Sequence, residues 1–181
     1  MKTASANQVQ VGLDPGVTPA GTGLDEVVWN ILGHTYYLKA EGANAFAFET
    51  YDPPGTFVPP HVHPTQDEFI YVLENEFDLY LDGAHHKAHA GELVRLPAGI
   101  PHGYYNLSSV PTRAMFWVAP GRRLRELFDV LHNMNDPEQV VREAAQREVH
   151  FLNPADYAFD PLALRRGGRE NSDRPLSGLS A

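Results

Sequence analysis

The stretch GTFVPPHVHPTQDE, residues 55–68, is the most informative part of the chain because it places two histidines close to a glutamate. His61 and His63 are two residues apart on an extended segment, so their side chains leave the backbone on the same face. Glu68 follows after a proline-containing turn that can reset the direction of its side chain. Two imidazoles on one face can bind one metal ion from adjacent directions, and a carboxylate is a further ready ligand.

A second stretch, GELVRLPAGIPHGYYN at residues 91–106, adds a third histidine. Pro97 and Gly99 mark a turn, since proline fixes φ and glycine allows conformations that other residues resist. His102 opens the strand that follows. The mixed donor set suits one divalent transition metal ion, namely Ni, Mn, Fe, Co, Cu or Zn. The predicted metal ligands are therefore His61, His63, Glu68 and His102.

Short apolar or alternating segments surround these two stretches. Strands are expected from about residue 27, and then at 34–40, 45–51, 68–73, 76–82, 88–90, 93–96, 102–107 and 112–119. Five prolines within 52–64 indicate a turn or an edge segment there. Strands this short and this frequent predict an antiparallel sandwich or barrel.

Two of these strands give more detailed expectations. The continuous apolar run at 68–73 is typical of a strand buried on both faces. The segment 76–82 alternates, which places Phe77, Leu79 and Leu81 inside and Asp78, Tyr80 and Asp82 outside. Asn75 between the two strands fits a tight turn with positive φ.

The periodicity changes after Gly121 from that of strands to that of helices. One amphipathic helix is indicated by Leu124, Leu127, Phe128 and Leu131, which share one face. Asp136, Pro137 and Glu138 indicate the start of a second helix that runs to about Val149. Phe151 and Leu152 could then return to the barrel surface.

The composition excludes several classes of function. The 181 residues include no cysteine, which rules out a disulfide framework, a thiolate nucleophile and cysteine-ligated zinc. A net charge of −9 argues against a nucleic acid partner or an anionic membrane surface. Neither a secretory signal nor a membrane-spanning segment is visible, so a cytoplasmic location is expected.

The two histidine-containing blocks resemble the two motifs of the cupin superfamily. The first motif matches Gly55, His61, His63 and Glu68, with Asn75 where the family has glycine. The second matches Gly91, Pro97, Gly99, His102 and Asn106 without departure. The resemblance implies an all-β fold, a cupin jelly-roll β-barrel with a short C-terminal helical segment, and one metal ion in the barrel mouth. The implied divisions are an N-terminal arm at 1–25, the barrel at 26–120, helices packed on it at 121–152 and a polar tail at 153–181.

Within that superfamily the chain resembles the quercetin 2,3-dioxygenase-like monocupins. The resemblance rests on 58–63 with Asp67 and Glu68, on 101–103, and on the exit into a helix at Pro120 and Gly121. Members with assigned activity open a flavonol with O2 and release carbon monoxide. The resemblance therefore implies a metal-dependent dioxygenase for a flavonol or a similar enolisable aromatic ring. Because Glu68 is the only acid in the predicted ligand set, we expect it also to act as a general base for the substrate hydroxyl.

A flat apolar substrate needs an aromatic or aliphatic slot above the metal. The residues expected to line that slot are Phe46, Phe48, Ile70, Val72, Tyr104, Met115 and Phe116. The same period-two pattern also describes an ordinary barrel core, which is the competing interpretation for Phe46, Phe48, Ile70 and Val72. The cluster of His85, His86 and His89 is interpreted as an exposed hairpin patch, with a second metal site as the alternative.

The sequence is also compatible with two other functions. One is a cupin isomerase, lyase or decarboxylase for a small polar substrate, which would be expected to line the barrel with cationic side chains. The other is a non-catalytic metal-containing cupin that binds a ligand. In each case we expect a homodimer that uses the second face of strand 68–73 and the N-terminal arm.

Overall fold

The computed structural model describes residues 14–157, so parts of the predicted arm at 1–25 and tail at 153–181 lie outside the described residues. The strands are β1 Val28–Ile31, β2 His34–Glu41, β3 Phe46–Asp52, β4 Phe57–Val62, β5 Asp67–Glu74, β6 Glu76–Leu81, β7 Ala84–His89, β8 Leu93–Leu96, β9 His102–Tyr105, β10 Thr112–Ala119 and β11 His150–Phe151. The helices are α1 Leu124–Leu131 and α2 Pro137–Ala145, with short 3-10 turns η1 Leu24–Glu26 and η2 Pro154–Asp156. No helix among these is long and apolar enough to cross a membrane.

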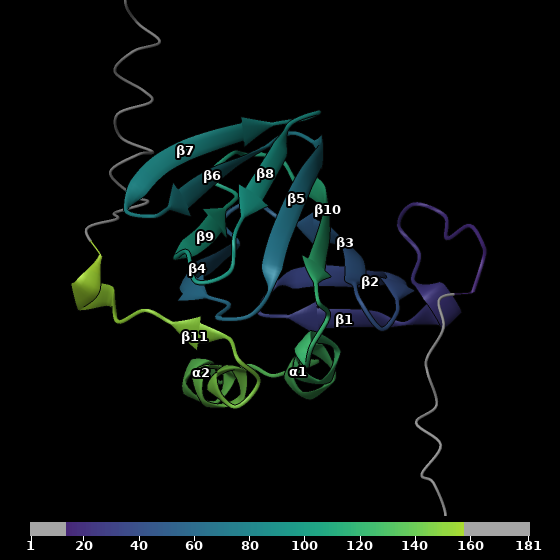
Figure 1. Ribbon diagram of the computed structural model, residues 1–181. Helices are drawn as coiled ribbons and strands as arrows, with labels where there is room; N and C mark the ends of the chain where they lie inside the picture. The colour runs from purple at the N-terminus through teal and green to yellow at the C-terminus, as the bar shows by residue number, and fades with distance from the viewer. Residues whose placement is uncertain (1–13, 158–181) are drawn as a thin grey trace, which may run out of the picture.

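The strands form two antiparallel sheets that enclose the core (Figure 1). The six-stranded sheet has the order β1-β2-β3-β10-β5-β8, and the five-stranded sheet has the order β11-β4-β9-β6-β7. The predicted all-β fold with a short helical segment near the C-terminal end is confirmed.

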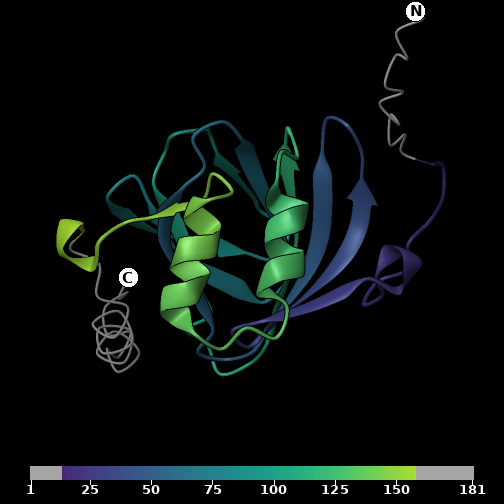
Figure 2. The ribbon, with the colours of Figure 1, turned by 90° about the horizontal axis from the view of Figure 1, so that it is seen from below.

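Both helices lie side by side across one end of the two sheets (Figure 2). The apolar face of α1, predicted from its periodicity, is buried there. Phe128 of α1 reaches the ring of Phe48 on β3 at 4.9 Å between centroids and that of Tyr36 on β2 at 5.0 Å. Burial of each such aromatic side chain contributes about 1.5–3 kcal/mol, so α1 is firmly attached to the barrel end.

The second helix begins as expected but ends earlier than expected. Asp136 caps it by accepting hydrogen bonds from the backbone N–H groups of Glu138 and Gln139, with Pro137 in the first helical position. The helix ends at Ala145, and the positive φ of 63° at Glu148 prevents a right-handed helix from reaching Val149. The chain then runs directly into β11.

The proline-rich segment 52–64 is a correction to the sequence-based expectation of a turn or an edge. Residues 57–62 form β4, which pairs with β9 on one side and with the two-residue β11 on the other. The register shifts between Val58 and His61, where Pro59 and Pro60 lie. An irregular ladder tolerates proline because the missing N–H leaves no partner unsatisfied there.

Gly103 on β9 allows this irregular stretch of β4 to approach closely. A Cβ at residue 103 would lie 2.9 Å from the backbone nitrogen of Pro60 and 2.9 Å from the backbone oxygen of Val58. Gly103→Ala is therefore expected to destabilise the fold by about 1–3 kcal/mol, a fall in Tm of roughly 2–12 °C by thermal unfolding. Gly16→Ala is the matched control, since no atom lies within 4 Å of the added Cβ. Equal Tm values for the two variants would contradict the close approach of β4 to β9 at residue 103.

Two burial expectations are wrong in the structure. Asp78 and Tyr80, expected outside, are buried, because Asp78 pairs with His85 and Lys87 while the ring of Tyr80 packs against Tyr157. The strand β5, expected to be buried on both faces, buries only one face. Tyr71 and Leu73 on its other face are exposed.

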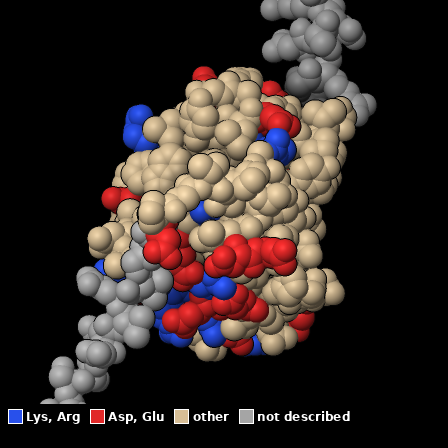
Figure 3. All heavy atoms as spheres, turned by 90° about the vertical axis from the view of Figure 1, so that its right-hand side faces the viewer, with Lys and Arg blue, Asp and Glu red and all other residues tan. Residues whose placement is uncertain are grey.

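Charged side chains on and beside α1 form ion pairs. Arg125 binds Glu41 of β2 at 2.7 Å and Asp129 at 3.1 Å, and Arg123 binds Glu126 at 2.8 Å. Figure 3 shows acidic and basic side chains mixed over the lower half of this side of the molecule, whereas the area above them carries few charges. Exposed pairs of this kind contribute little stability individually, about 0–1 kcal/mol.

The homodimer stays a prediction, and the exposed face of β5 makes it testable. Phe69 stacks on Trp117 of β10 at 5.2 Å beside the exposed Tyr71. Tyr71→Glu is expected to lower the mass measured by analytical ultracentrifugation from dimer to monomer, because it puts a charge in the middle of an apolar face. Val141→Glu, on the exposed side of α2, should leave the mass unchanged. A wild-type chain that is monomeric at every concentration contradicts the prediction.

Candidate metal centre

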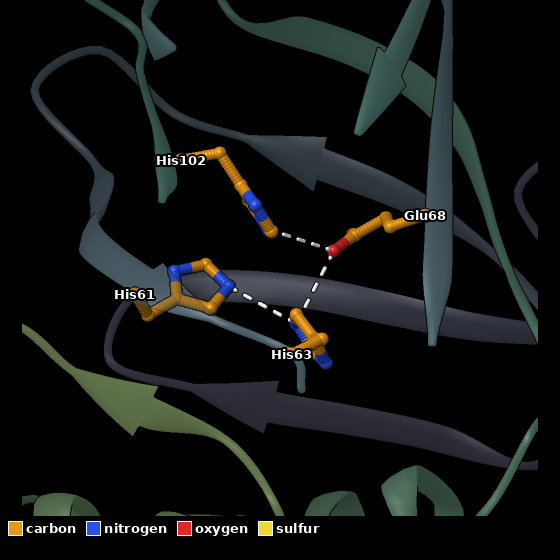
Figure 4. A group of neighbouring side chains, drawn as sticks. All are labelled: His61, His63, Glu68 and His102. Carbon is orange, nitrogen blue, oxygen red and sulfur yellow. Dashed lines mark hydrogen bonds and ion pairs between the residues drawn. The ribbon is translucent and has the colours of Figure 1, made fainter. Parts of the chain in front are cut away.

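The four predicted ligands come from three strands and meet inside the barrel (Figure 4). His61 is on β4, with His63 just beyond its end, while Glu68 is on β5. His102 begins β9 and lies directly opposite His61 in the ladder. One donor atom from each of the four lies within 4.8 Å of the others, and all four residues are buried.

The spacing of the donor atoms suits a common ion. The Nε2 atoms of His61 and His63 are 3.2 Å apart, and Glu68 Oε2 lies 3.2 Å from His102 Nε2 and 3.3 Å from His63 Nε2. Two atoms bound about 2.1 Å from one ion are about 3.0–3.4 Å apart in octahedral or tetrahedral geometry. The observed separations fall within that range.

The outer nitrogen of each ring determines which inner atoms are free to bind. Nδ1 of His61 faces the carbonyl oxygen of Pro59 at 2.9 Å, and Nδ1 of His102 faces that of Ile100 at 2.9 Å. Nδ1 of His63 faces the side-chain oxygen Oε1 of Gln66 at 3.1 Å. Because an amide oxygen only accepts hydrogen bonds, each Nδ1 carries the proton and each Nε2 presents its lone pair to the centre.

The electrostatics of the cluster favour neutral imidazoles beside a carboxylate. Burial, with the neighbouring His102 and His63, lowers the pKa of His61 well below its usual range. Burial also lowers the pKa of His63 and outweighs the opposite effect of Glu68. Burial alone would raise the pKa of Glu68, but the hydrogen bond with His102 and the effect of His63 hold it below its usual value. Three lone pairs and a negative charge converge in a buried space, so the donor set fits a bound cation.

Gln66 is the residue of this centre that sequence reasoning missed. Its side chain is buried, and its Nε2 donates hydrogen bonds to the carbonyl oxygens of Pro120 at 2.9 Å and Gly121 at 2.8 Å. Those bonds fix the amide so that its oxygen accepts from His63. Gln66 therefore orients the ring of His63, a predicted ligand, and no motif spacing indicates that role.

A cavity of about 100 Å³ opens beside the cluster. His61, His63 and Glu68 line one part of it, and most of the remaining wall is aromatic or aliphatic. Side chains of both helices close it, among them Leu127, Phe128 and Val140. The helices that cross the barrel end in Figure 2 are thus the cover of this cavity.

The structure divides the expected substrate-pocket residues into three groups. Phe48, Tyr104 and Phe116 line the cavity. Phe46, Ile70 and Val72 are buried in the hydrophobic core and do not line it. Met115 is only partly buried, because its neighbours Ala114 and Phe116 occupy the inward face of β10. The cavity is instead completed by helix residues that the sequence reasoning assigned to packing alone.

Three cavity residues carry polar groups outside the cluster. The hydroxyls of Tyr36 and Tyr104 lie 3.1 Å apart, and burial raises the pKa of both well above the usual range. His34 holds Asp52 at 2.5 Å through Nδ1, and its Nε2 donates to the carbonyl oxygen of Phe57 at 3.2 Å. Neither His34 nor Tyr36 has a partner at a recognisable spacing, so the sequence does not indicate these contacts.

The cluster at 85–89 on β7 is paired with carboxylates of the neighbouring strand β6. His85 binds Asp78 at 2.9 Å, and His89 binds Glu76 at 3.2 Å. Lys87 binds both of those carboxylates and so neutralises the charge that a cation would need. Among the described residues, 14–157, one group of three or more His, Asp or Glu side chains is spaced closely enough to hold a metal ion. It consists of His61, His63, Glu68 and His102.

Asn106 stabilises the loop after β9. Its Nδ2 donates to the carbonyl oxygens of Asp52 and Val110, both at 2.8 Å, and its Oδ1 accepts from Ser108. Asn75 adopts the expected positive φ of 65° in the turn between β5 and β6. Both residues therefore shape turns around the site, as the motif spacing suggested.

Comparison with known proteins agrees with this geometry. One curated relative, "Quercetin 2,3-dioxygenase" of Bacillus subtilis (strain 168), is 34% identical over 114 residues, which cover 56% of this chain and 33% of the relative. Another, "Tetracenomycin polyketide synthase protein TcmJ" of Streptomyces glaucescens, is 29% identical over 92 residues, covering 51% of this chain and 58% of the relative. The chain thus spans between a third and three fifths of these relatives' length.

A solved structure and a family model point to the same fold. The structure of an RmlC-like cupin from Shewanella frigidimarina NCIMB 400 superposes with a TM-score of 0.54 at 18% identity, covering 62% of this chain and 97% of the other. At that identity the likeness concerns the fold alone. Residues 48–118 match the family model described as "Cupin domain". That segment includes all four residues of the buried cluster, so the likeness to the cupin family covers the candidate metal centre.

Proposed function

We propose that this protein is a metal-dependent dioxygenase that opens a flavonol or a similar enolisable aromatic ring with O2. The observation that carries the proposal is a buried cluster of three histidines and one glutamate at the side of an otherwise apolar cavity. The relative named as a quercetin 2,3-dioxygenase supports the same reaction class. A relative named as a polyketide synthase protein leaves room for aromatic substrates other than flavonols.

The chain's own residues supply most of the required chemistry. His61, His63, Glu68 and His102 would hold the ion, which when bound supplies a Lewis acid able to acidify an enol and react with O2. Glu68 is the carboxylate of the cluster and lines the cavity, so it can accept the proton of the substrate hydroxyl. Gln66 holds the ring of His63 in one orientation during the reaction.

The cavity wall favours an apolar substrate over a small polar one. Among the described residues that line the cavity there is no lysine or arginine. An isomerase, lyase or decarboxylase for a sugar or an oxo-acid would need such cations to bind its substrate. Phe48, Phe116 and Phe128 instead offer aromatic surfaces to a flat ring.

The size of the cavity sets a condition on how a flavonol binds. Sites for drug-sized ligands usually measure about 300–1,000 Å³, whereas this cavity measures about 100 Å³. The cover formed by α1 and α2 therefore moves outward when a molecule with several rings binds. After it closes, the same apolar side chains exclude water from the reaction.

Oxygen uptake tests the proposal. Protein reconstituted separately with each of the six candidate ions is mixed with a flavonol, a sugar or an oxo-acid, and dissolved O2 and released carbon monoxide are measured. Flavonol-dependent uptake with matching carbon monoxide is expected for at least one ion. The 3-methoxy derivative of the same flavonol is the matched control, since it has no hydroxyl proton for Glu68 to accept. Absence of uptake with every ion overturns the proposal.

A further inference from the structure

The cavity has a polar group separate from the metal-ligand cluster, namely the paired hydroxyls of Tyr36 and Tyr104. Tyr36 comes from β2 in the six-stranded sheet and Tyr104 from β9 in the five-stranded sheet. Both residues line the cavity, and their exposed fractions are only 5% and 6%. The two oxygens are 3.1 Å apart, a normal distance for one hydrogen bond.

The pair has one hydroxyl proton more than that bond uses. Each phenol carries one O–H, and one of the two donates to the other. Within residues 14–157 neither hydroxyl has a second hydrogen-bond partner. His34, which lies against both rings, is unavailable because its two nitrogens already bind Asp52 and Phe57. Leaving a buried donor without an acceptor costs free energy. A ligand oxygen in the cavity that accepts a hydrogen bond from the remaining O–H would therefore be stabilised there.

We propose that the hydroxyl pair of Tyr36 and Tyr104 is a ligand subsite that donates a hydrogen bond to a carbonyl or enolate oxygen of an aromatic molecule. The subsite rests on the proposed function for the class of ligand, since an enolisable aromatic ketone carries such an oxygen. It assigns these two residues a role in recognition, whereas the proton transfer belongs to Glu68.

The surroundings of the pair fit an aryl ketone. The ring of Tyr36 lies 5.6 Å from that of Phe48 and 5.0 Å from that of Phe128. The ring of Tyr104 lies 5.1 Å from that of Phe116. These aromatic neighbours pack well on a flat ring but offer no polar atom, so the hydroxyl pair would fix which way the ligand's oxygen points.

Two small probes of equal shape isolate the hydrogen bond. Acetophenone carries a carbonyl oxygen, and α-methylstyrene has a CH2 group in its place. In a cavity of about 100 Å³ a single-ring probe also requires less outward movement of α1 and α2 than a flavonol does. The dissociation constants of both are measured by NMR titration of the full chain at matched metal content and without O2, so that no turnover occurs.

The double variant Tyr36→Phe/Tyr104→Phe is expected to bind acetophenone about threefold to tenfold more weakly than the wild type, while α-methylstyrene is unaffected. Tyr51→Phe is the matched control, because that tyrosine lies on β3 with its side chain partly exposed and outside the cavity. If the double variant fails to fold, the two single variants give the same comparison, with the larger loss at the tyrosine whose proton is free.

Three results overturn the subsite: unchanged acetophenone binding in the variants, equal weakening of both probes, or no binding of either probe to the wild type. The outcome is separate from that of the oxygen-uptake experiment. Selective loss of acetophenone binding in a chain that consumes no O2 supports the subsite while the dioxygenase proposal fails. Flavonol-dependent O2 uptake in a chain whose variants bind both probes as the wild type does supports the dioxygenase proposal, while the subsite fails.

Discussion

His61→Ala is expected to remove most of the metal that the purified chain retains. The imidazole supplies one of four donor atoms that lie within 4.8 Å of one another, and the remaining three leave the ion open on the side of β4. Replacing residues that merely orient metal ligands costs about 10–100-fold in metal affinity, so loss of a ligand should cost at least about 100-fold. Elemental analysis after dialysis against a limiting metal concentration measures the effect.

His86→Ala is the matched control for that experiment. His86 is exposed on β7 and does not belong to the buried cluster. The control variant should retain the wild-type amount of metal and unfold at the same temperature. Full metal retention by His61→Ala would mean that the cluster is not the place where the chain binds its ion.

The second large effect is expected at Glu68. In Glu68→Gln the side chain keeps an oxygen that can face the ion but loses the capacity to accept a proton. Turnover of a flavonol per bound metal ion should fall by about 100- to 10,000-fold, the range typical of general acid–base groups. The rate is divided by the metal content of the same sample, so that partial metal loss does not enter the comparison.

Glu92→Gln serves as the control, because Glu92 is exposed and binds the backbone N–H of His89 at the rim of the barrel. It should leave the rate per metal ion unchanged. A Glu68→Gln protein that retains metal and turns over at the wild-type rate would remove the proposed role of Glu68 as base.

The sequence predicts the cluster partly because the geometry of the pair His61 and His63 is local, whereas Glu68 and His102 also depend on the resemblance of the two motifs. His61 and His63 share a face by strand periodicity, and prolines and glycines fix the turns on either side. Asn75 was likewise predictable, since few residues other than glycine tolerate its positive φ. In such cases the backbone conformation of a few neighbouring residues decides the outcome.

Features that depend on distant contacts were not predictable from the same reasoning. Asp78 is buried because His85 and Lys87 from the next strand satisfy its charge. Met115 was expected in the pocket and Leu127 only on a packed helix, because nothing local shows that α1 closes the cavity. The pairing of Tyr36 with Tyr104 joins two sheets across 68 residues of sequence.

The bonds of Gln66 have a consequence for how the ion and the substrate affect each other. One end of this amide holds His63, and the other holds the carbonyl oxygens at Pro120 and Gly121, where the chain leaves the barrel toward α1. If outward movement of α1 shifts that junction, the two binding events are thermodynamically linked. The linkage is reciprocal, so a ring that binds a metal-loaded chain more tightly must strengthen the hold on the metal by the same factor.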